Sequence, residues 1–348
     1  MTNLDERHTA RLDDDLLEVL RAATSTPTLA FDGEPTRLQG GFWAELVAFR
    51  LRGAPAGWQG GLVARVMPDS AIAARETAIQ AEVAAQGFPT PAVHLAGGPD
   101  AGLGQAFMVM DLAPGGPLLS GLDGFGAITA LPRLARRLPD ALADSMAALH
   151  RLDPTPVRAR LVGAGAGTSG VDEFVEGLGQ AAGVLGRADL GSAARWLIAN
   201  PPPSTPDVIC HGDLHPFNLL IDPADAITVL DWSGGLIGPA AYDVAFTTLI
   251  LAEPPVVVPD ALRPLVRAAG RLLARRFQRT YTRRVGTGLD AESLRWHEGV
   301  ICLRALVEVA GWIAAGRLED HVGHPWLISG PAFAARLSRL TSIQVTPR

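Results

Sequence analysis

The chain has 348 residues, 48% of them hydrophobic and 19% charged, so it can bury a substantial core and is expected to be ordered. All 30 basic residues are arginine, and with 36 acidic residues they give a net charge of -6, which argues against a nucleic-acid partner. Cys210 and Cys302 are too few for a disulfide framework and lack the spacing of a zinc site. No secretion signal and no run of about 20 apolar residues is visible, so we expect a cytoplasmic protein with no membrane partner.

The first part of the chain is predicted to be a small unit rich in β-strands. Its clearest element is a helix at Ser70–Gln86, for which Asp69 or Ser70 is the cap and Gly87 the stop. Short apolar runs predict the strands around it. The other elements expected here are a helix at Asp13–Thr24 and strands at Thr36–Leu38, Leu46–Leu51, Gly61–Val66 and Ala106–Met110.

Long helical patterns replace the strands beyond the glycine- and proline-rich segment 114–117. Only residues 208–231 interrupt these patterns with β-structure. A β-rich lobe followed by a helical lobe predicts an α+β fold, divided into 1–110 and 111–348, with a cleft between its parts. The predicted helices are Leu131–Arg151, 172–199, 260–282 and 291–316.

The segment 208–232 is the most informative and reads VICHGDLHPFNLLIDPADAITVLDW. Two apolar runs, Leu219–Ile221 and Ile227–Leu230, flank the sequence DPAD, which has Asp and Pro where a turn favours them. The segment therefore predicts a β-hairpin.

The open end of this hairpin carries polar residues. Paired antiparallel residues lie about 4.5–5.5 Å apart, so the hairpin is expected to place Asn218 and Asp231 side by side. Magnesium favours such a site, taking one or two protein oxygens while phosphates and water complete its shell. Asp213 adds a third polar group near the same end.

The run HGDLHPFNLL followed by VLDW resembles the aminoglycoside phosphotransferase (choline-kinase-like) family, which has the protein-kinase fold. The resemblance covers nearly the whole chain and implies a bilobal fold, with a nucleotide-binding N-lobe and a helical C-lobe. It implies that Asp213 orients the acceptor hydroxyl and accepts its proton, and that Asn218 and Asp231 hold magnesium. It also implies ATP as the donor, with GTP as the alternative. Phosphoryl transfer needs little beyond such positioning and charge neutralisation.

Neighbouring polar residues admit other readings. His211 is expected to organise the fold, with its ring bonded to the backbone of the loop or hairpin, whereas His215 has either a packing role or a minor contact near phosphate. A hydrolase that uses His211, Asp213 and His215 as metal ligands is a weaker alternative, because no further cluster has ligand spacing. Asp243 is expected to be structural and to accept hydrogen bonds from the backbone amides of the Asp213 loop.

The nucleotide side is predicted from the first lobe. Glu76 shares one stripe of its predicted helix with Ile79 and Val83, so it needs a cationic partner if it is buried. Arg65, in the predicted strand before this helix, is the natural partner. The resembling family commonly has lysine here, contacting phosphates, so Arg65 is a departure that keeps the charge and offers a longer, planar fork.

Two further stretches are candidates for nucleotide contacts. Gly40 and Gly41 lie between two predicted strands, where they either let backbone amides approach phosphate or form a plain hairpin turn. Asp111 and Leu112 end an apolar strand that either offers backbone groups to an adenine edge or belongs to the core.

The sequence thus predicts an ATP- and magnesium-dependent phosphotransferase that acts on a hydroxyl of a small molecule, such as an aminoglycoside, an amino alcohol or a sugar. A catalytically weak or inactive nucleotide-binding relative is one alternative, motivated by Arg65. A protein kinase is another, but only eleven residues separate Asp231 from Asp243, which leaves no long segment for docking a peptide.

The predicted helix at 291–316 carries large aromatic and acidic side chains. These residues either form a wall suited to a cationic acceptor or belong to ordinary helix packing and the solvated face, and packing is favoured. The four candidates are Trp296, Glu298, Glu308 and Trp312.

Overall fold

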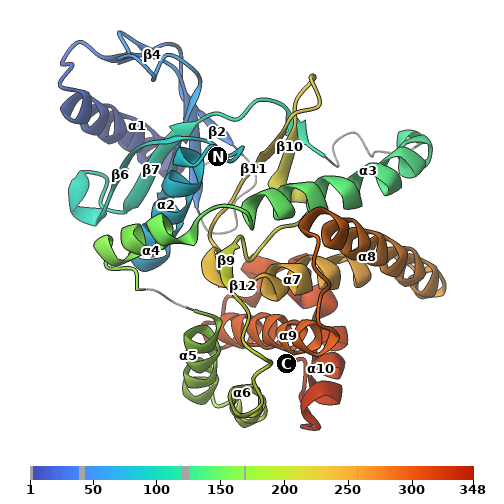
Figure 1. Ribbon diagram of the computed structural model, residues 1–348. Coiled ribbons are helices and arrows are strands. Elements are labelled where there is room, and N and C mark those ends of the chain that lie inside the picture. The colour runs from blue at the N-terminus through green and yellow to red at the C-terminus, as the bar shows by residue number, and fades with distance from the viewer. Residues whose placement is uncertain (1–2, 39–43, 119–124, 168–169, 257) are drawn as a thin grey trace. The chain divides into compact units, whose positions relative to one another are not determined.

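The structure is a computed structural model that describes residues 3–38, 44–118, 125–167, 170–256 and 258–348 (Figure 1). The chain forms two compact units, each with its own hydrophobic core. The first unit comprises residues 1–116, 155–167 and 220–233, and the second comprises residues 117–154, 168–219 and 234–348. A sheet dominates the first unit and helices dominate the second, which confirms the predicted α+β fold.

The first unit is built on a five-stranded antiparallel sheet with the strand order β2-β3-β5-β7-β6. All six residues of the central strand β5 are buried, as expected for a strand covered on both faces. A two-stranded pair, β1 with β4, accompanies this sheet. The strands are β1 (Ala30–Phe31), β2 (Thr36–Leu38), β3 (Glu45–Phe49), β4 (Leu51–Arg52), β5 (Leu62–Met67), β6 (Val93–Gly97) and β7 (Ala106–Asp111).

Alternate side chains of β5 pack into two different layers. Val66 shares a core with leucines of α1 (Asn3–Thr24), whereas Met67 packs with α2 (Ser70–Ala85) on the other face. Successive side chains of a strand point to opposite faces, so Arg65, two residues before Met67, is directed toward α2.

Helix α2 begins and ends where its capping chemistry predicts. The Asp69 carboxylate accepts hydrogen bonds from the backbone N–H groups of Ala71 and Ile72, at 2.9 and 3.0 Å. Gly87 follows the helix with a φ of 81°, in the left-handed region that glycine tolerates. These two local signals therefore hold the helix that carries Glu76 in a defined register.

Two segments from later in the chain join the first unit. One is α4 (Pro154–Gly163), whose Arg160 lies 3.2 Å from Glu82 of α2. The other is the predicted hairpin of β10 (Leu219–Ile221) and β11 (Ile227–Val229), which forms a three-stranded sheet in the order β11-β10-β8 with β8 (Gly116–Pro117). The hairpin turn is held by the Asp222 carboxylate, which accepts two backbone hydrogen bonds of 2.8 Å.

The second unit is helical, apart from the antiparallel pair of β9 (Asp207–Cys210) and β12 (Leu236–Pro239). Its core takes residues from α5, α6, α7, α9 and α10, and α7 and α9 are buried over most of their length. Gly186, with a φ of 70°, separates α5 from α6. The helices are α3 (Phe125–Leu149), α5 (Val171–Val184), α6 (Ala188–Ala199), α7 (Ala240–Ala252), α8 (Arg263–Val285), α9 (Ala291–Ala314) and α10 (Pro325–Thr341).

Some predicted elements differ from the observed ones. The strand predicted at Leu46–Leu51 is two strands, β3 and β4, which pair with different partners. The single helix predicted at 172–199 is the helical hairpin of α5 and α6, because Gly186 turns the chain between them. Strand β6 and helices α4 and α10 were not predicted.

No helix in the described part of the chain combines the length and the apolar character needed to cross a bilayer.

Candidate active site

Arg65 is the centre of a charge cluster in the first unit. Its Nε lies 3.1 Å from Glu76 Oε1, and its Nη2 lies 3.3 Å from Asp231 Oδ1. Arg65 is 7% exposed and Glu76 1% exposed, whereas 31% of the Asp231 side chain is exposed. The expected pairing of Arg65 with Glu76 is thus present, and Asp231 of the hairpin reaches the same guanidinium.

Burial shifts the pKa values of Glu76 and Arg65 in opposite directions. Burial raises the pKa of Glu76 to about 7, and the Asp231 charge adds to this, while Arg65 opposes it. Burial would lower the pKa of Arg65, but the charges of Glu76 and Asp231 outweigh it and place this pKa above its usual range. Arg65 is therefore a permanent cation that faces two carboxylates.

Asp231 has an unusual backbone conformation. Its φ is 64°, in the left-handed region that residues other than glycine rarely adopt, and such strain is often found at functional sites. The neighbouring residues hold it there. The Trp232 indole donates to Thr90 Oγ1 at 2.9 Å, and the Thr90 hydroxyl donates to the Val229 carbonyl at 2.8 Å. These bonds fix the end of the hairpin against the loop that follows α2.

In the second unit, Asp213 lies on a loop whose backbone is held by Asp243 of α7. One carboxylate oxygen of Asp243 accepts the N–H of His211 at 2.8 Å, and the other accepts the N–H of Gly212 at 2.6 Å. The expected structural role of Asp243 is therefore confirmed. Gly212 has a φ of 70°, and a Cβ at this position would lie 2.0 Å from the Gly234 carbonyl oxygen, so only glycine fits.

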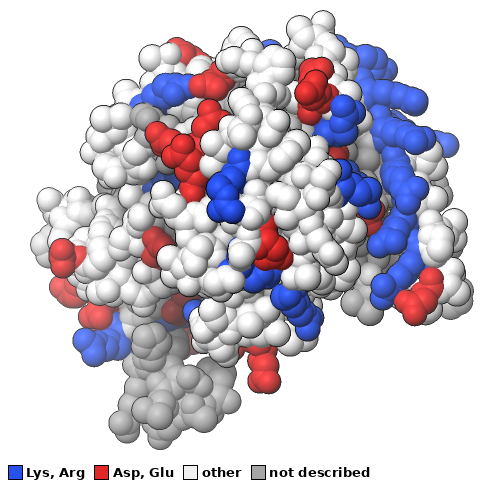
Figure 2. Space-filling view, turned by 90° about the horizontal axis from the view of Figure 1, so that it is seen from below, with Lys and Arg blue, Asp and Glu red and all other residues white. Residues whose placement is uncertain are grey.

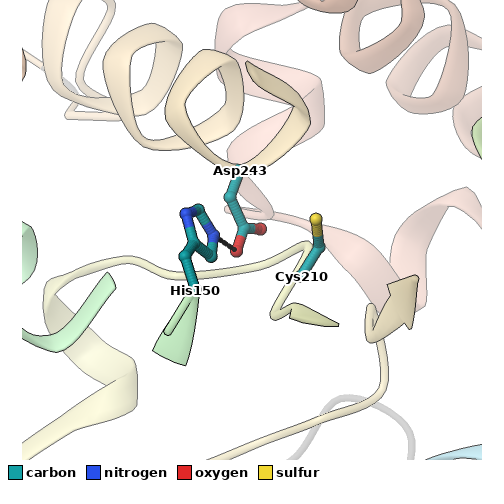
Figure 3. A group of neighbouring side chains, drawn as sticks. All are labelled: His150, Cys210 and Asp243. Atoms are coloured by element: carbon teal, nitrogen blue, oxygen red, sulfur yellow. Dashed lines mark hydrogen bonds and ion pairs between the residues drawn. The ribbon is translucent and has the colours of Figure 1, made fainter. Parts of the chain in front are cut away.

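Behind Asp243, a buried histidine continues the network. This residue is His150, which follows α3, and its Nε2 lies 3.1 Å from Asp243 Oδ2 (Figure 3). Its Nδ1 lies 2.8 Å from the hydroxyl oxygen of Tyr281 in α8. Because a carboxylate can only accept, Nε2 carries the proton, and the Tyr281 hydroxyl donates to Nδ1. No sequence pattern predicted these hydrogen bonds, because Asp243 and Tyr281 are 93 and 131 positions from His150 in the chain.

His150, Cys210 and Asp243 also place three potential metal-ligand atoms within 4.8 Å of one another (Figure 3). Their chemistry does not favour a metal. Both Asp243 oxygens already accept hydrogen bonds from the loop, and a metal would compete with these bonds. Complete burial and the Asp243 charge raise the pKa of the Cys210 thiol well above its usual range, which disfavours the thiolate that would bind a metal. The cluster is a structural support for the loop.

Arg304 of α9 supports the same loop from another side and was missed by the sequence reading. Its Nη1 donates to the Gly212 carbonyl at 3.0 Å, and its Nε donates to Glu308 at 2.9 Å. Burial would lower its pKa, but Glu308, Tyr242 and Asp213 together raise it above the usual range. Both backbone groups of Gly212 are therefore bonded to charged side chains.

Asn218 bonds directly to Asp213. Its Nδ2 donates to the Asp213 backbone carbonyl at 2.9 Å and lies 3.3 Å from Asp213 Oδ2. Its Oδ1 accepts no hydrogen bond from any residue that the structure describes, which leaves an oxygen of the kind magnesium prefers. In the first unit, the Asp231 carboxylate is likewise an oxygen donor of the kind that magnesium binds.

The two histidines of the motif also have clear surroundings. Nδ1 of His211 accepts the Asp213 backbone N–H at 3.3 Å, as expected for a residue that organises the loop. Nε2 of His215 lies 3.6 Å from Asp213 Oδ2, and its ring stands beside Phe217 and Phe246. His215 thus combines a packing role with a position next to Asp213.

The predicted adenine contacts need one refinement. The N–H of Asp111 donates to the Ala92 carbonyl, and that of Leu112 donates to the Gly61 carbonyl, so neither N–H is available to a base. The Asp111 carboxylate lies 2.6 Å from His94 Nε2. Gly40 and Gly41 lie outside the described residues.

The aromatic and acidic residues of α9 pack or pair instead of forming a wall for a cation. Trp296 and Trp312 belong to the core of the second unit. Glu298 is paired with Arg336, and Glu308 bonds to Arg304 and to the Trp326 indole. The packing alternative is the one that the structure supports.

The sequence matches the model of a family described as "Phosphotransferase enzyme family" over residues 49–284. No curated protein matches the chain. The solved structures with the same fold that are described here are 16–18% identical in sequence, an identity at which likeness establishes the fold alone.

Three of these structures illustrate the match. A protein from Ralstonia eutropha, provisionally described as an aminoglycoside phosphotransferase, is 17% identical with a TM-score of 0.65, covering 93% of this chain and 98% of that one. A thermostable variant of aminoglycoside phosphotransferase APH(4)-Ia, crystallised with ADP and hygromycin B, is 18% identical with a TM-score of 0.58, covering 95% and 97%. Macrolide 2'-phosphotransferase from Brachybacterium faecium is 18% identical with a TM-score of 0.54, covering 93% and 98%.

Proposed function

Because the chain belongs to the phosphotransferase enzyme family, we propose that it transfers the terminal phosphoryl group of ATP to a hydroxyl group of a small molecule. The observation that carries this proposal is the loop of Asp213. Asp243 and Arg304 bond to the backbone beside Asp213, and Asn218 bonds to Asp213 itself. A carboxylate held in this way, with 22% of its side chain exposed, can position an acceptor hydroxyl.

In the proposed reaction, the acceptor oxygen forms a bond to the terminal phosphorus while the bond from that phosphorus to ADP breaks. Asp213 orients the acceptor hydroxyl and accepts its proton. Phosphoryl transfer depends mainly on positioning and on neutralising the charge of the phosphates. The Arg65 guanidinium supplies a permanent positive charge for the phosphates on the nucleotide side, where Glu76 and Asp231 hold it.

Magnesium, when bound, would neutralise phosphate charge, and the residues that would hold it are Asn218 and Asp231. The carbonyl groups of Asp111 and Leu112 are the proposed contacts to the adenine edge. Gly40 and Gly41 remain proposed phosphate contacts on the strength of the sequence.

The proposed acceptor is a small hydroxylated molecule. Between Asp231 and Asp243, the chain forms one turn and the short strand β12, with no long segment that could dock a peptide. The structures that share this fold include proteins described with hygromycin B, as a macrolide 2'-phosphotransferase and as a choline/ethanolamine kinase family protein. We therefore propose an aminoglycoside, a macrolide, an amino alcohol or a sugar-like alcohol as the acceptor class.

The test is ATP consumption measured against a panel of such alcohols, with the phosphate monoester identified by phosphorus NMR. Asp213→Asn should bind Mg-ATP like the parent protein and turn over the best acceptor about 10²–10⁴-fold more slowly. Asp260→Asn, at an exposed position of the same unit, is the matched control and should leave turnover unchanged.

Transfer to a protein substrate but to no member of the panel would contradict the proposed acceptor class. Turnover of Asp213→Asn within a factor of two of the parent would remove Asp213 from the reaction.

A further inference from the structure

Helix α8 carries an unusual density of arginine for a chain with net negative charge. Eight of its 23 residues are arginine and none is acidic. Six of these arginines follow one another at intervals of four residues, which places them in one continuous ridge along the helix. They are Arg263, Arg267, Arg271, Arg275, Arg279 and Arg283.

Ion pairs with described residues neutralise part of this charge. Arg263 pairs with Asp260 at 3.0 Å and Arg267 with Glu253 at 2.9 Å, at the beginning of the ridge. Arg276 and Arg284, beside the ridge, pair with Asp140 and Asp144 of α3.

The rest of the ridge makes no ion pair with an acidic side chain among the described residues, although Asp140 interacts electrostatically with Arg283. Arg271, Arg275 and Arg279 are exposed and their side chains make no ion pair there, while Arg283 bonds only to Thr280 and to a backbone carbonyl. We call these four residues the arginine row. Figure 2 shows blue side chains gathered along the side of the molecule on which α8 lies.

The arginine row is unfavourable for the isolated helix. Like charges four residues apart destabilise a helix by about 0.2–0.5 kcal/mol per pair, and the row contains three such pairs in succession. Arg283 is partly offset, because Asp140 of α3 interacts with it electrostatically and because the helix dipole favours a cation in the last turn. For Arg271, Arg275 and Arg279, no carboxylate in the described part of the chain offsets this cost, which points to an external anion.

The outward face of α8 is divided along its length. Leu265 and Leu272, 68% and 65% exposed, lie toward its beginning, and Ala268 and Ala269 between them are also exposed. The arginine row continues toward the end of the helix. Beside it, a hollow of about 920 Å³ is lined by Arg279 and Arg283 and also by side chains from the start of α9. The face therefore combines exposed leucines, which lie toward the start of the helix, with a row of arginines that continues to its end.

We propose that this face of α8 docks an acidic amphipathic helix of another protein. The row presents one cation every four residues, or about 6 Å along the axis, and carboxylates four residues apart on a partner helix have the same spacing. Exposed leucines seven residues apart match the apolar seam by which helices pair. Arginine also suits carboxylates because its planar fork binds them through two hydrogen bonds.

Other anionic partners fit less well. The aromatic side chains of α8, Phe277 and Tyr281, are buried, so none is offered for stacking on a nucleic-acid base. The net charge of -6 repels a long polyanion or an anionic bilayer as a whole, whereas a short helix in register meets only the local positive charge.

The probe is a synthetic helical peptide with leucines seven residues apart in one half and glutamates four residues apart in the other. Binding to the full chain is measured by fluorescence anisotropy at several salt concentrations. The triple variant Arg271→Glu, Arg275→Glu, Arg279→Glu should bind the peptide at least about tenfold more weakly, because each exposed ion pair contributes about 0.2–1 kcal/mol and each reversal adds repulsion. Added salt should weaken binding of the parent protein.

The control variant Arg50→Glu, Arg195→Glu, Arg339→Glu makes the same change in net charge at exposed positions elsewhere and should bind like the parent. Phosphotransfer and the melting temperature serve as controls for folding, and neither should fall in the α8 triple variant.

Four results would overturn the proposal. They are absence of peptide binding, equal loss in the control variant, equal binding of a peptide with the same composition in scrambled order, and tighter binding to phosphatidylserine vesicles or to oligo-dT than to the peptide.

Discussion

Arg65 contacts two carboxylates that have different neighbours, and a substitution should therefore have two separable effects. Arg65→Ala leaves Glu76 buried without its cation, which typically costs about 3–5 kcal/mol, and it also removes positive charge from the proposed phosphate site. We expect a lower melting temperature together with weaker Mg-ATP binding by calorimetry. Arg65→Lys keeps the charge and should retain nucleotide binding and a measurable part of turnover.

The control for Arg65 is Arg52→Ala in the same unit, since Arg52 is exposed and lies 3.9 Å from Asp32. If Arg65→Ala melts and binds nucleotide like Arg52→Ala, neither the ion pair nor the phosphate contact of Arg65 matters.

Glu76 makes stability depend on pH in a predictable direction. Its pKa is about 7 in the folded protein against an ordinary value of 4.5, so the folded state holds a proton that the unfolded chain has lost. The contribution of Glu76 to the free energy of unfolding should therefore be greatest below about pH 4.5. This contribution should fall as the pH rises through 7. The full contribution is about 3 kcal/mol at most.

Urea unfolding of the parent and of Glu76→Gln, at several values between pH 5 and pH 8, measures this contribution. The stability of the parent relative to Glu76→Gln should decline across this range. Glu82→Gln, on the same helix but paired with Arg160 nearer the surface, is the matched control. The same decline relative to both variants would show that Glu76 is not its source.

At the scale of elements, α3, α7 and α8 meet behind the loop of Asp213 through His150, Asp243 and Tyr281. His150→Ala removes one donor to Asp243 and leaves two backbone donors in place, so the loop should loosen without unfolding. We expect kcat to fall while the KM for ATP stays constant, because the Arg65 cluster is in the other unit. Tyr281→Phe should lower the free energy of unfolding by about 1 kcal/mol, the usual contribution of one hydrogen bond. It should lower kcat less than His150→Ala does.

His297→Ala provides the control for His150. This histidine is also buried in the second unit, but it bonds to the Ser293 carbonyl in its own helix. The His297→Ala substitution should lower the melting temperature and leave kcat unchanged. An equal effect of both variants on kcat would mean that His150 contributes only to general stability.

Elements with local signals were predictable, and elements that depend on distant contacts were not. Asp69 and Gly87 mark the ends of α2 within one stretch of sequence, and the DPAD turn marks the hairpin in the same way. The apolar pattern at 172–199 continues across Gly186, so periodicity alone could not reveal the break between α5 and α6. Helix α10 contains Pro331, which normally argues against a helix.

The candidate site follows the same rule. Asp213, Asn218 and Asp231 belong to one short stretch of sequence that forms a motif, and the spacing of Glu76 in its helix indicated that Arg65 would be its partner. By contrast, Arg304 lies 92 residues from Gly212, and no pattern in the sequence connects them. Residues that support a loop from other helices are selected by three-dimensional packing, which leaves no short motif.

At the scale of the whole molecule, the net charge conceals an uneven distribution. A value of -6 suggests a uniformly acidic surface, yet α8 alone carries eight arginines. Charge arguments from composition therefore apply to long-range attraction and repulsion, whereas a local partner meets the charge of one face.

Both cysteines of the chain, Cys210 and Cys302, are buried free thiols in the second unit. The first unit contains no cysteine in its sequence, so a thiol reagent in solution would label only the half of the molecule that carries Asp213. We expect the folded protein to be inert to Ellman's reagent and to react in urea at a rate set by the opening of the second unit. Single-thiol variants, Cys210→Ala and Cys302→Ala, should react at equal rates if this unit opens as a whole. Faster labelling of Cys210, measured in the Cys302→Ala variant, would instead reveal a local opening beside the loop of Asp213. The native thiols therefore report the opening rate of this unit without an added probe.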